Sequence, residues 1–413
     1  MAGETAHFGL RKREPTPAIS SSSWLPRFKP MVERAHAALA EPFRGLVAGT
    51  GIVPGLFARE PTGVPLGSLV EAARAFLTAL TPPQRKAICF AVDDEAWRRW
   101  SNIHPWLMRH GVCLADLDGD GRERALALLR ETMSAAGYRS ARDIMRLNEH
   151  MLEVTGKADE YSEWFYWISV FGTPSAEGPW GWQIDGHHLN INCFVLGDQL
   201  VVTPSFMGSE PVLARSGKYA GTRVFAAEEE QGHALMRALP ADEQARATIG
   251  KDLPGELLTA AFQDNRGIDP AGIRYDELPA ECRERLEALL ATYTGRIRTG
   301  HAEIRYREVK RHLSKTHFAW IGPCDDASPF YYRILSPVIL VEFDHVSGIV
   351  YDNDTPSRDH IHTVVRTPNG NDYGKDLLRQ HYATHDHAHA ATAHHHGHGC
   401  GHSHHHHHHP GRP

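Results

Sequence analysis

Two histidines in the spacing H-x-H lie in the segment DHIHTVVR, late in the chain. If this segment is a β-strand, alternate side chains point to one face of the sheet, so His360 and His362 project in parallel and can bind one metal ion. H-x-H also occurs in strands that bind no metal. Arg366 has the same parity, and it could pair with a carboxylate or orient an anionic group of a substrate. The pattern therefore predicts two metal ligands without identifying the ion.

Two further strand patterns place polar side chains at alternate positions. In GHHLNIN, His188 and Asn190 alternate with apolar residues, although asparagine is disfavoured in strands. In VILVEFDHV, Glu342 and Asp344 share one face, where two carboxylates repel each other unless a cation, a shared proton or a basic group lies between them. A solvent-facing strand, or a histidine that holds a neighbouring loop, would produce the same patterns without a site.

Together the three patterns predict a mononuclear metal site on one sheet. Two or three histidines with one carboxylate form the ligand set of zinc, iron and manganese sites that keep an open coordination position. The cofactor would be a divalent transition metal, with zinc, iron, copper and nickel as candidates. The expected metal ligands are His188, Glu342, His360 and His362. The expected catalytic residues are Glu342, Asp344 and Arg366, and the expected substrate-binding residues are Trp182, His187 and Asn190.

The last part of the chain is unusually rich in histidine. Fifteen of the 29 histidines fall between His381 and His409, in a flexible Gly/Ala-rich context that buries too little apolar surface to fold. Dense imidazoles bind nickel, zinc, copper or cobalt at neutral pH and release them as the pH falls. An expression tag is the alternative explanation for this run. The expected tail ligands are His394, His395, His396, His398, Cys400 and His402.

Composition excludes several classes of protein. The formal net charge of −6 gives no electrostatic basis for binding nucleic acid. No apolar run approaches the roughly 20 residues that span a bilayer, and the first residues lack the apolar core of a secretory signal. The six cysteines are dispersed without a C-x-x-C pair, which suits reduced thiols. We therefore expect a cytoplasmic protein with a small-molecule substrate and no membrane partner, in an oligomeric state that the sequence leaves open.

The elements that would position the site change in type along the chain. Apolar residues with helical spacing recur through much of residues 31–157, for example in SLVEAARAFLTAL, where Ser68 is the expected N-cap. DLDGDG imitates the start of a calcium loop, but Ala127 stands where the bidentate glutamate is needed, which favours a helix N-cap instead. From YSEWFYWISVFG onward strand patterns alternate with helices, including a hairpin at LGDQ and two helices broken near Gly295 or Gly300.

These patterns predict an α+β fold, in which a helical N-terminal half packs on a largely antiparallel central sheet. We expect a flexible arm over residues 1–30 and a single α+β domain over residues 31–383. Within that domain, residues 31–157 would be helical and residues 158–383 would mix strands and helices. Residues 384–413 would form a disordered, histidine-rich tail.

Several long motifs resemble a bacterial and fungal family that is catalogued as a domain of unknown function. They are the GPWGW…GHHL segment and the late HIH…NDYGKDLL segment, and the similarity extends over roughly residues 68–382. The chain departs from the family pattern in its tail and in the insert HVSGIVYDNDTPSRD. The resemblance implies no activity. It implies that the family pattern includes His187, His188, Glu342, Asp344, His360, His362, Asp372 and Gly374.

The residues favour a metal-dependent enzyme that acts on a small polar substrate. Hydrolysis and oxidation both remain open, because zinc and ferrous iron use overlapping ligand sets. One alternative is a metal-handling protein that stores or delivers ions through its histidine-rich tail. Another is a small-molecule binding protein without metal, whose histidines hydrogen-bond the ligand. Metal retained by the core without the tail would separate the first hypothesis from the other two.

Overall fold

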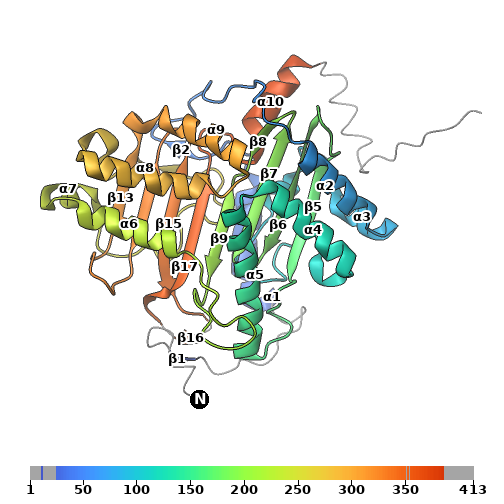
Figure 1. The fold of residues 1–413 in the computed structure, drawn as a ribbon, viewed down its shortest axis with the longest axis horizontal. Helices are drawn as coiled ribbons and strands as arrows, with labels where there is room; N and C mark the ends of the chain where they lie inside the picture. The colour runs from blue at the N-terminus through green and yellow to red at the C-terminus, as the bar shows by residue number, and fades with distance from the viewer. Residues whose placement is uncertain (1–10, 13–24, 350, 353, 386–413) are drawn as a thin grey trace, which may run out of the picture.

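The computed structural model describes residues 11–12, 25–349, 351–352 and 354–385, and Figure 1 shows their arrangement. The centre is a mixed, mostly antiparallel sheet in the order β10-β13-β14-β15-β17-β9-β7-β6-β5-β3, with β12, β4 and β8 pairing at its sides. Its strands are β3 (Cys89–Phe90), β4 (Val112–Cys113), β5 (Tyr166–Gly172), β6 (Pro179–Gly186), β7 (Leu189–Leu196), β8 (Gln199–Val201), β9 (Ser205–Ser209), β10 (Thr248–Gly250), β12 (Ile273–Arg274), β13 (His317–Ile321), β14 (Tyr331–Leu335), β15 (Leu340–Ser347) and β17 (Pro356–Arg366).

Two short pairs of strands lie outside this sheet. They are β1 (Arg11–Lys12) with β16 (Tyr351–Asp352), and β2 (Val47–Ala48) with β11 (Gly267–Ile268). The helices are α1 (Leu25–Ala40), α2 (Gly67–Thr78), α3 (Pro82–Ile88), α4 (Gly119–Thr132), α5 (Ala135–Thr155), α6 (Ala226–Ala238), α7 (Ala241–Ala247), α8 (Ala280–Thr294), α9 (Thr299–Lys310) and α10 (Lys375–Thr384). The described residues therefore combine helices with a large sheet, and the predicted α+β class is confirmed.

The two faces of the sheet differ because side chains alternate along each strand. In Figure 1, α4, α5, α6 and α8 lie on the near side of the sheet, whereas α1 lies behind it. Apolar residues of β7, β15 and β17 join those of the helices in one buried cluster, which includes Ile191, Val341 and Ile361. The opposite face is covered largely by loops and short helical turns, and a second cluster there includes Trp100 and Leu257. The polar stripes lie on this second face.

The strands that carry the polar stripes are close neighbours in the sheet, as the sequence predicts. β15 pairs with β17, β17 with β9, and β9 with β7, all antiparallel. Their polar side chains do not face solvent, because the loops bury them. They include Asn190, Asn192, Glu342, Asp344, His360 and His362, each less than 9% exposed.

Several local expectations are confirmed. Gly197 and Asp198 form the turn between β7 and β8, and α8 and α9 are separate helices. Asp118 caps α4, accepting a hydrogen bond from the Gly121 N–H at 2.7 Å. Among the described residues, no helix is both long and apolar enough to cross a membrane.

Other expectations are wrong. Ser68 is not an N-cap, because α2 begins one residue before it with Leu66 at the cap position. The strand expected from residue 187 begins only at Leu189, which leaves His188 in a turn. Cys89 is disulfide-bonded, whereas four other cysteines are free, so the expectation of reduced thiols fails at that position. The expected tail ligands, from His394 to His402, lie outside the described residues.

Candidate metal centre

Three buried imidazoles meet on the polar face of the sheet. The Nε2 atom of His360 lies 3.2 Å from that of His188 and 3.1 Å from that of His362. One ligand atom from each ring fits in a group with all separations below 4.8 Å, and all three residues are buried. In tetrahedral coordination with metal–nitrogen bonds of about 2.05 Å, two ligand atoms are about 3.3 Å apart. The separations therefore match the edge of a coordination tetrahedron, and the group could hold a metal ion.

His188 reaches this group from the turn between β6 and β7. Its backbone has φ 63°, a left-handed conformation that side chains other than glycine rarely adopt. The conformation is fixed on both sides, because the His188 N–H donates to the Asn102 carbonyl at 3.0 Å and the His188 carbonyl accepts from the Gly208 N–H at 2.8 Å. Backbone conformations of this kind cluster at functional sites, where surrounding contacts hold them.

Gly208 on β9 leaves the space in which two of the rings lie. A Cβ atom at this position would come within 2.9 Å of His362 Cδ2 and 3.2 Å of His188 Cδ2, and within 2.8 Å of the Ile361 carbonyl oxygen. Gly208 is also the residue directly opposite His362 in the β9–β17 pairing. A side chain here would push the imidazoles apart, so the close approach requires glycine.

Hydrogen-bond acceptors beside Nδ1 determine which ring nitrogen of His360 and of His362 carries the proton. The Nδ1 atom of His360 lies 2.7 Å from the Ser347 carbonyl oxygen and 3.1 Å from Glu210 Oε2, and Nδ1 of His362 lies 2.8 Å from Glu256 Oε1. Carbonyl and ionised carboxylate oxygens only accept hydrogen bonds, so Nδ1 must carry the proton in each ring. In the neutral rings Nε2 then offers its lone pair toward the centre of the group. Carboxylate–histidine pairs of this kind orient the ligands in many metal sites.

The surroundings of His188 and His360 shift the pKa values of these two rings in opposite directions. Burial, reinforced by the neighbouring histidines, holds the pKa of His188 well below its ordinary value, which keeps this ring neutral. Burial also lowers the pKa of His360, but the Glu210 carboxylate and the Ser347 carbonyl outweigh it, so that the pKa of His360 is raised. A metal ligand must be deprotonated at the ligating atom, and binding to this group therefore displaces protons from it.

The fourth expected ligand, Glu342, has other partners. It is fully buried and its two carboxylate oxygens accept hydrogen bonds from the Leu258 and Thr259 N–H groups, the Thr259 hydroxyl and the Tyr331 hydroxyl, at 2.6–2.9 Å. These contacts tie the loop that carries Glu256 to β15. Glu342 is therefore joined to the histidines through that loop, and it is not a member of the three-histidine group.

Asp344 lies directly opposite His362 in the β15–β17 pairing, so the two side chains project from the same face of the sheet. Both carboxylate oxygens of Asp344 are buried and have no hydrogen-bond partner among the described residues. Burial, followed by the nearby Glu256 and Glu342 carboxylates, raises the pKa of Asp344 well above its ordinary value. An isolated buried carboxyl group is costly unless it is protonated or meets a cation or a ligand.

The remaining expected site residues occupy other surroundings. Arg366 is fully buried and paired with Asp264 and Asp372 at 2.6 and 3.2 Å. Trp182 lies on the helix-covered face, where its ring nitrogen donates to the Thr132 hydroxyl at 3.1 Å.

His187 adjoins the histidine group, and Asn190 lies on β7, which begins just after His188. The ring of His187 stacks on that of His188 with 4.0 Å between centroids, and its Nδ1 lies 3.1 Å from Asn148 Oδ1. Asn190 accepts a hydrogen bond from the Asn192 amide at 2.8 Å. The structure thus brings His187, His188, Asp344, His360 and His362 to one region, whereas Arg366 and Trp182 are engaged elsewhere.

The sequence patterns did not predict four residues of the site. Asn102, Gly208, Glu210 and Glu256 lie in loops or at strand positions without a periodic pattern. The strand pattern that reveals a ligand does not extend to the loops that supply its hydrogen-bond partners.

Comparison with known proteins places the chain in a family. A family model described as a protein of unknown function (DUF3500) matches residues 62–375, which is most of the chain. The chain belongs to the DUF3500 family. The matched range of the DUF3500 model contains all three histidines together with Glu210 and Glu256. No curated protein and no solved structure matches this chain.

Proposed function

We propose that the core binds one divalent transition metal through His188, His360 and His362 and is a metal-dependent enzyme acting on a small polar substrate. The observation that carries the proposal is the convergence of three Nε2 atoms within bonding geometry of one ion, beside a buried carboxyl group that has no hydrogen-bond partner among the described residues. Three protein ligands leave a coordination position free, as in catalytic rather than structural sites. This ligand set omits Glu342.

The residues around the histidines have distinct roles in this proposal. A bound metal would supply Lewis acidity at its open position. Asp344, which has no hydrogen-bond partner among the described residues, would take up or release a proton of the reacting group. The side-chain oxygen of Asn102 is also buried and has no partner among the residues that the structure describes. It would accept a hydrogen bond from the substrate. Buried, unsatisfied polar groups favour a polar ligand over an apolar one.

Among the groups around the histidines, the Glu256 side chain is in contact with solvent. The Glu256 side chain is 42% exposed, whereas the side chains of His360 and His362 are 5% and 8% exposed. Glu256 would hold His362 in place and lie beside the path of the substrate. The burial of the rings limits that substrate to a small molecule.

Elemental mass spectrometry on protein purified without nickel resin tests the proposal. The full chain would be compared with a chain ending at His385, because the histidine-rich tail can bind ions of its own. We expect about one ion per shortened chain, lost in the double variant His360→Ala, His362→Ala. The control is His233→Ala, His312→Ala, which removes two histidines outside the group and should keep the ion. Zinc would direct the search toward hydrolytic substrates and iron toward oxidative ones.

Absence of an ion from the shortened wild-type chain, even after incubation with zinc, iron, copper and nickel salts in turn, would contradict the proposal. The histidines would then be a hydrogen-bonded cluster within a binding or structural protein. An ion that stays in the double variant would place the metal elsewhere in the chain.

A further inference from the structure

A cavity lies on the helix-covered side of the molecule, away from His188, His360 and His362. It is a cleft of about 360 Å³ between the loop at residues 56–62, β8 and the C-terminal part of α9. Volumes of this size fall within the range of small-molecule sites. An adjoining cavity of about 70 Å³ shares Leu200, Val201, Arg305, Glu308 and Asn371 with it and extends it toward β17.

The two sites lie at different points along β17. Thr367, which lines the adjoining cavity, follows the end of this strand, whereas His362 lies five residues earlier. Five residues of a strand extend roughly 17 Å. A ligand in the cleft would therefore not contact the histidine group, and the two sites can be tested separately.

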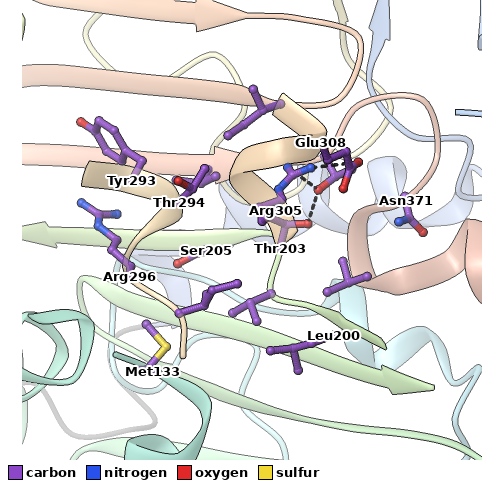
Figure 2. Close-up of a pocket in the computed structure, with 16 residues that line it drawn as sticks. Met133, Leu200, Thr203, Ser205, Tyr293, Thr294, Arg296, Arg305, Glu308 and Asn371 are labelled. Carbon is purple, nitrogen blue, oxygen red and sulfur yellow. Dashed lines mark hydrogen bonds and ion pairs between the residues drawn. The ribbon is translucent and has the colours of Figure 1, made fainter. Parts of the chain in front are cut away.

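Charges in the cleft are not balanced. Figure 2, which draws the adjoining cavity, shows Arg305 and Glu308 projecting from α9 beside Thr203. Their side chains are 3.3 Å apart, so these two charges compensate each other. Arg307 and Arg311 also line the cleft, and neither makes an ion pair or a side-chain hydrogen bond with any part of the chain that the structure describes. Glu60 is the remaining carboxylate of the lining.

Arg307 and Arg311 are four residues apart, at the end of α9 and just after it, which brings their side chains to the same side. A forked guanidinium is the side chain best suited to carboxylate and phosphate groups, to which it can donate two parallel hydrogen bonds. Two such groups at one cleft, in a chain with a net charge of −6, mark a local cationic site.

His301 supplies a buried acceptor in the same cleft. The residue is 3% exposed, and its Nε2 donates to the Asp198 carbonyl at 2.8 Å. Nδ1 is therefore unprotonated in the neutral ring, and it is buried without a partner among the described residues. Burial lowers the pKa of His301, which favours this neutral form. A ligand hydroxyl would satisfy the free nitrogen.

Apolar side chains complete the lining, among them Leu56, Phe57, Leu200 and Leu377. We propose that this cleft binds a small organic oxyanion, whose carboxylate or phosphate meets Arg307 and Arg311, whose hydroxyl meets His301, and whose short apolar part packs on the leucines. The proposal concerns a site separate from the metal centre and does not depend on it.

Isothermal titration calorimetry on the full chain tests the cleft with three probes. They are 3-hydroxyhexanoate, its uncharged methyl ester and hexyl phosphate. We expect saturable binding of at least one anion and binding of the ester weaker by about tenfold or more, since a charge-assisted hydrogen bond is lost. The comparison of 3-hydroxyhexanoate with hexyl phosphate decides between a carboxylate and a phosphate ligand.

Matched variants assign the binding to the cleft. Arg307→Gln, Arg311→Gln should weaken binding of the anion by about tenfold or more, whereas Lys310→Gln, Lys315→Gln, which makes the same change in net charge outside the lining, should leave it unchanged. The variant His360→Ala, His362→Ala should also bind normally, which separates this proposal from the metal centre. Absence of saturable binding of either anion, or equal losses in the arginine and lysine variants, would overturn the proposal.

Discussion

At the scale of single residues, Gly208 shows how closely the histidine group is packed. A methyl group there would approach the His362 ring and the Ile361 carbonyl oxygen more closely than real Cβ atoms do, and it would also crowd the His188 ring at 3.2 Å. We expect Gly208→Ala to lower metal affinity by about tenfold or more, because the rings can no longer converge. The measurement is a competition titration against a coloured chelator.

Gly250→Ala is the matched control. Gly250 is also a strand glycine, on β10, but a Cβ atom at this position would meet no atom within 4 Å. The Gly250→Ala variant should keep the metal affinity of the wild type. An unchanged affinity in Gly208→Ala would show that the backbone of β9 can move enough to admit the methyl group.

His110 makes stability depend on pH. Burial lowers the pKa of His110 to about 4, and its Nδ1 lies 2.7 Å from the Ser169 hydroxyl oxygen. The ring stays neutral in the folded protein while it takes up a proton in the unfolded chain below about pH 6.5. The stabilising contribution is complete above that pH and is lost as the pH falls toward 4.

We expect the titration of His110 to lower the free energy of unfolding by about 2 kcal/mol when the pH falls from 7 to 5. Urea unfolding at both pH values, in the wild type and in His110→Gln, measures the difference. The variant should be less stable at pH 7 but should lose less stability on acidification. Parallel losses in the two proteins would mean that His110 titrates normally in the folded state.

At the scale of elements, what the sequence predicts and what it misses follow from the range of the physical signal. Side chains on β15 and β17 could be assigned to faces because the two-residue period is a property of each strand alone. The pairing of Asp344 with His362 confirms that assignment. Hydrogen-bond partners such as Glu256 come from loops more than 100 residues away, and no local pattern encodes them.

The same difference between strand patterns and remote loop contacts explains why Glu342 was expected to be a metal ligand. Its parity predicts correctly that it faces the polar side of the sheet, yet the loop at residues 256–260 covers it and supplies its hydrogen-bond donors. With these three donors from the loop and the Tyr331 hydroxyl of β14, the buried carboxylate is a satisfied group. The sequence could not separate this arrangement from a metal ligand, because both require a buried carboxylate on the same face.

We expect Glu342→Gln to loosen this loop. A glutamine amide would turn N–H groups toward backbone donors that now meet carboxylate oxygens, so amide hydrogen exchange should accelerate at Leu258 and Thr259. Metal affinity should fall about tenfold in parallel, because Glu256 would no longer be fixed on His362. The control is Glu287→Gln, which alters a carboxylate on α8 that accepts a hydrogen bond from the Tyr275 hydroxyl. A loss of metal without faster exchange would instead support direct coordination by Glu342.

At the scale of the whole molecule, the histidine group joins segments that are remote in sequence. His188 and His360 are separated by 172 residues, and β9 lies between β17, which carries His360, and β7, which begins just after His188. An ion bound by both would connect the two halves of the sheet in the folded protein only. Any ligand that binds the folded state alone raises the free energy of unfolding by mass action.

We therefore expect metal to stabilise the entire chain. At a free metal concentration one hundred times the dissociation constant, the free energy of unfolding rises by about 2.7 kcal/mol, which corresponds to about 3 °C in Tm for a protein of this length. Calorimetry should be run on chelator-treated protein ending at His385, so that ions on the tail do not contribute. His360→Ala, His362→Ala should show no shift, and His233→Ala, His312→Ala should show the full one. If metal raised the Tm only when the tail is present, the stabilising ions would be bound by the tail, and the three histidines of the core would owe their proximity to hydrogen bonding alone.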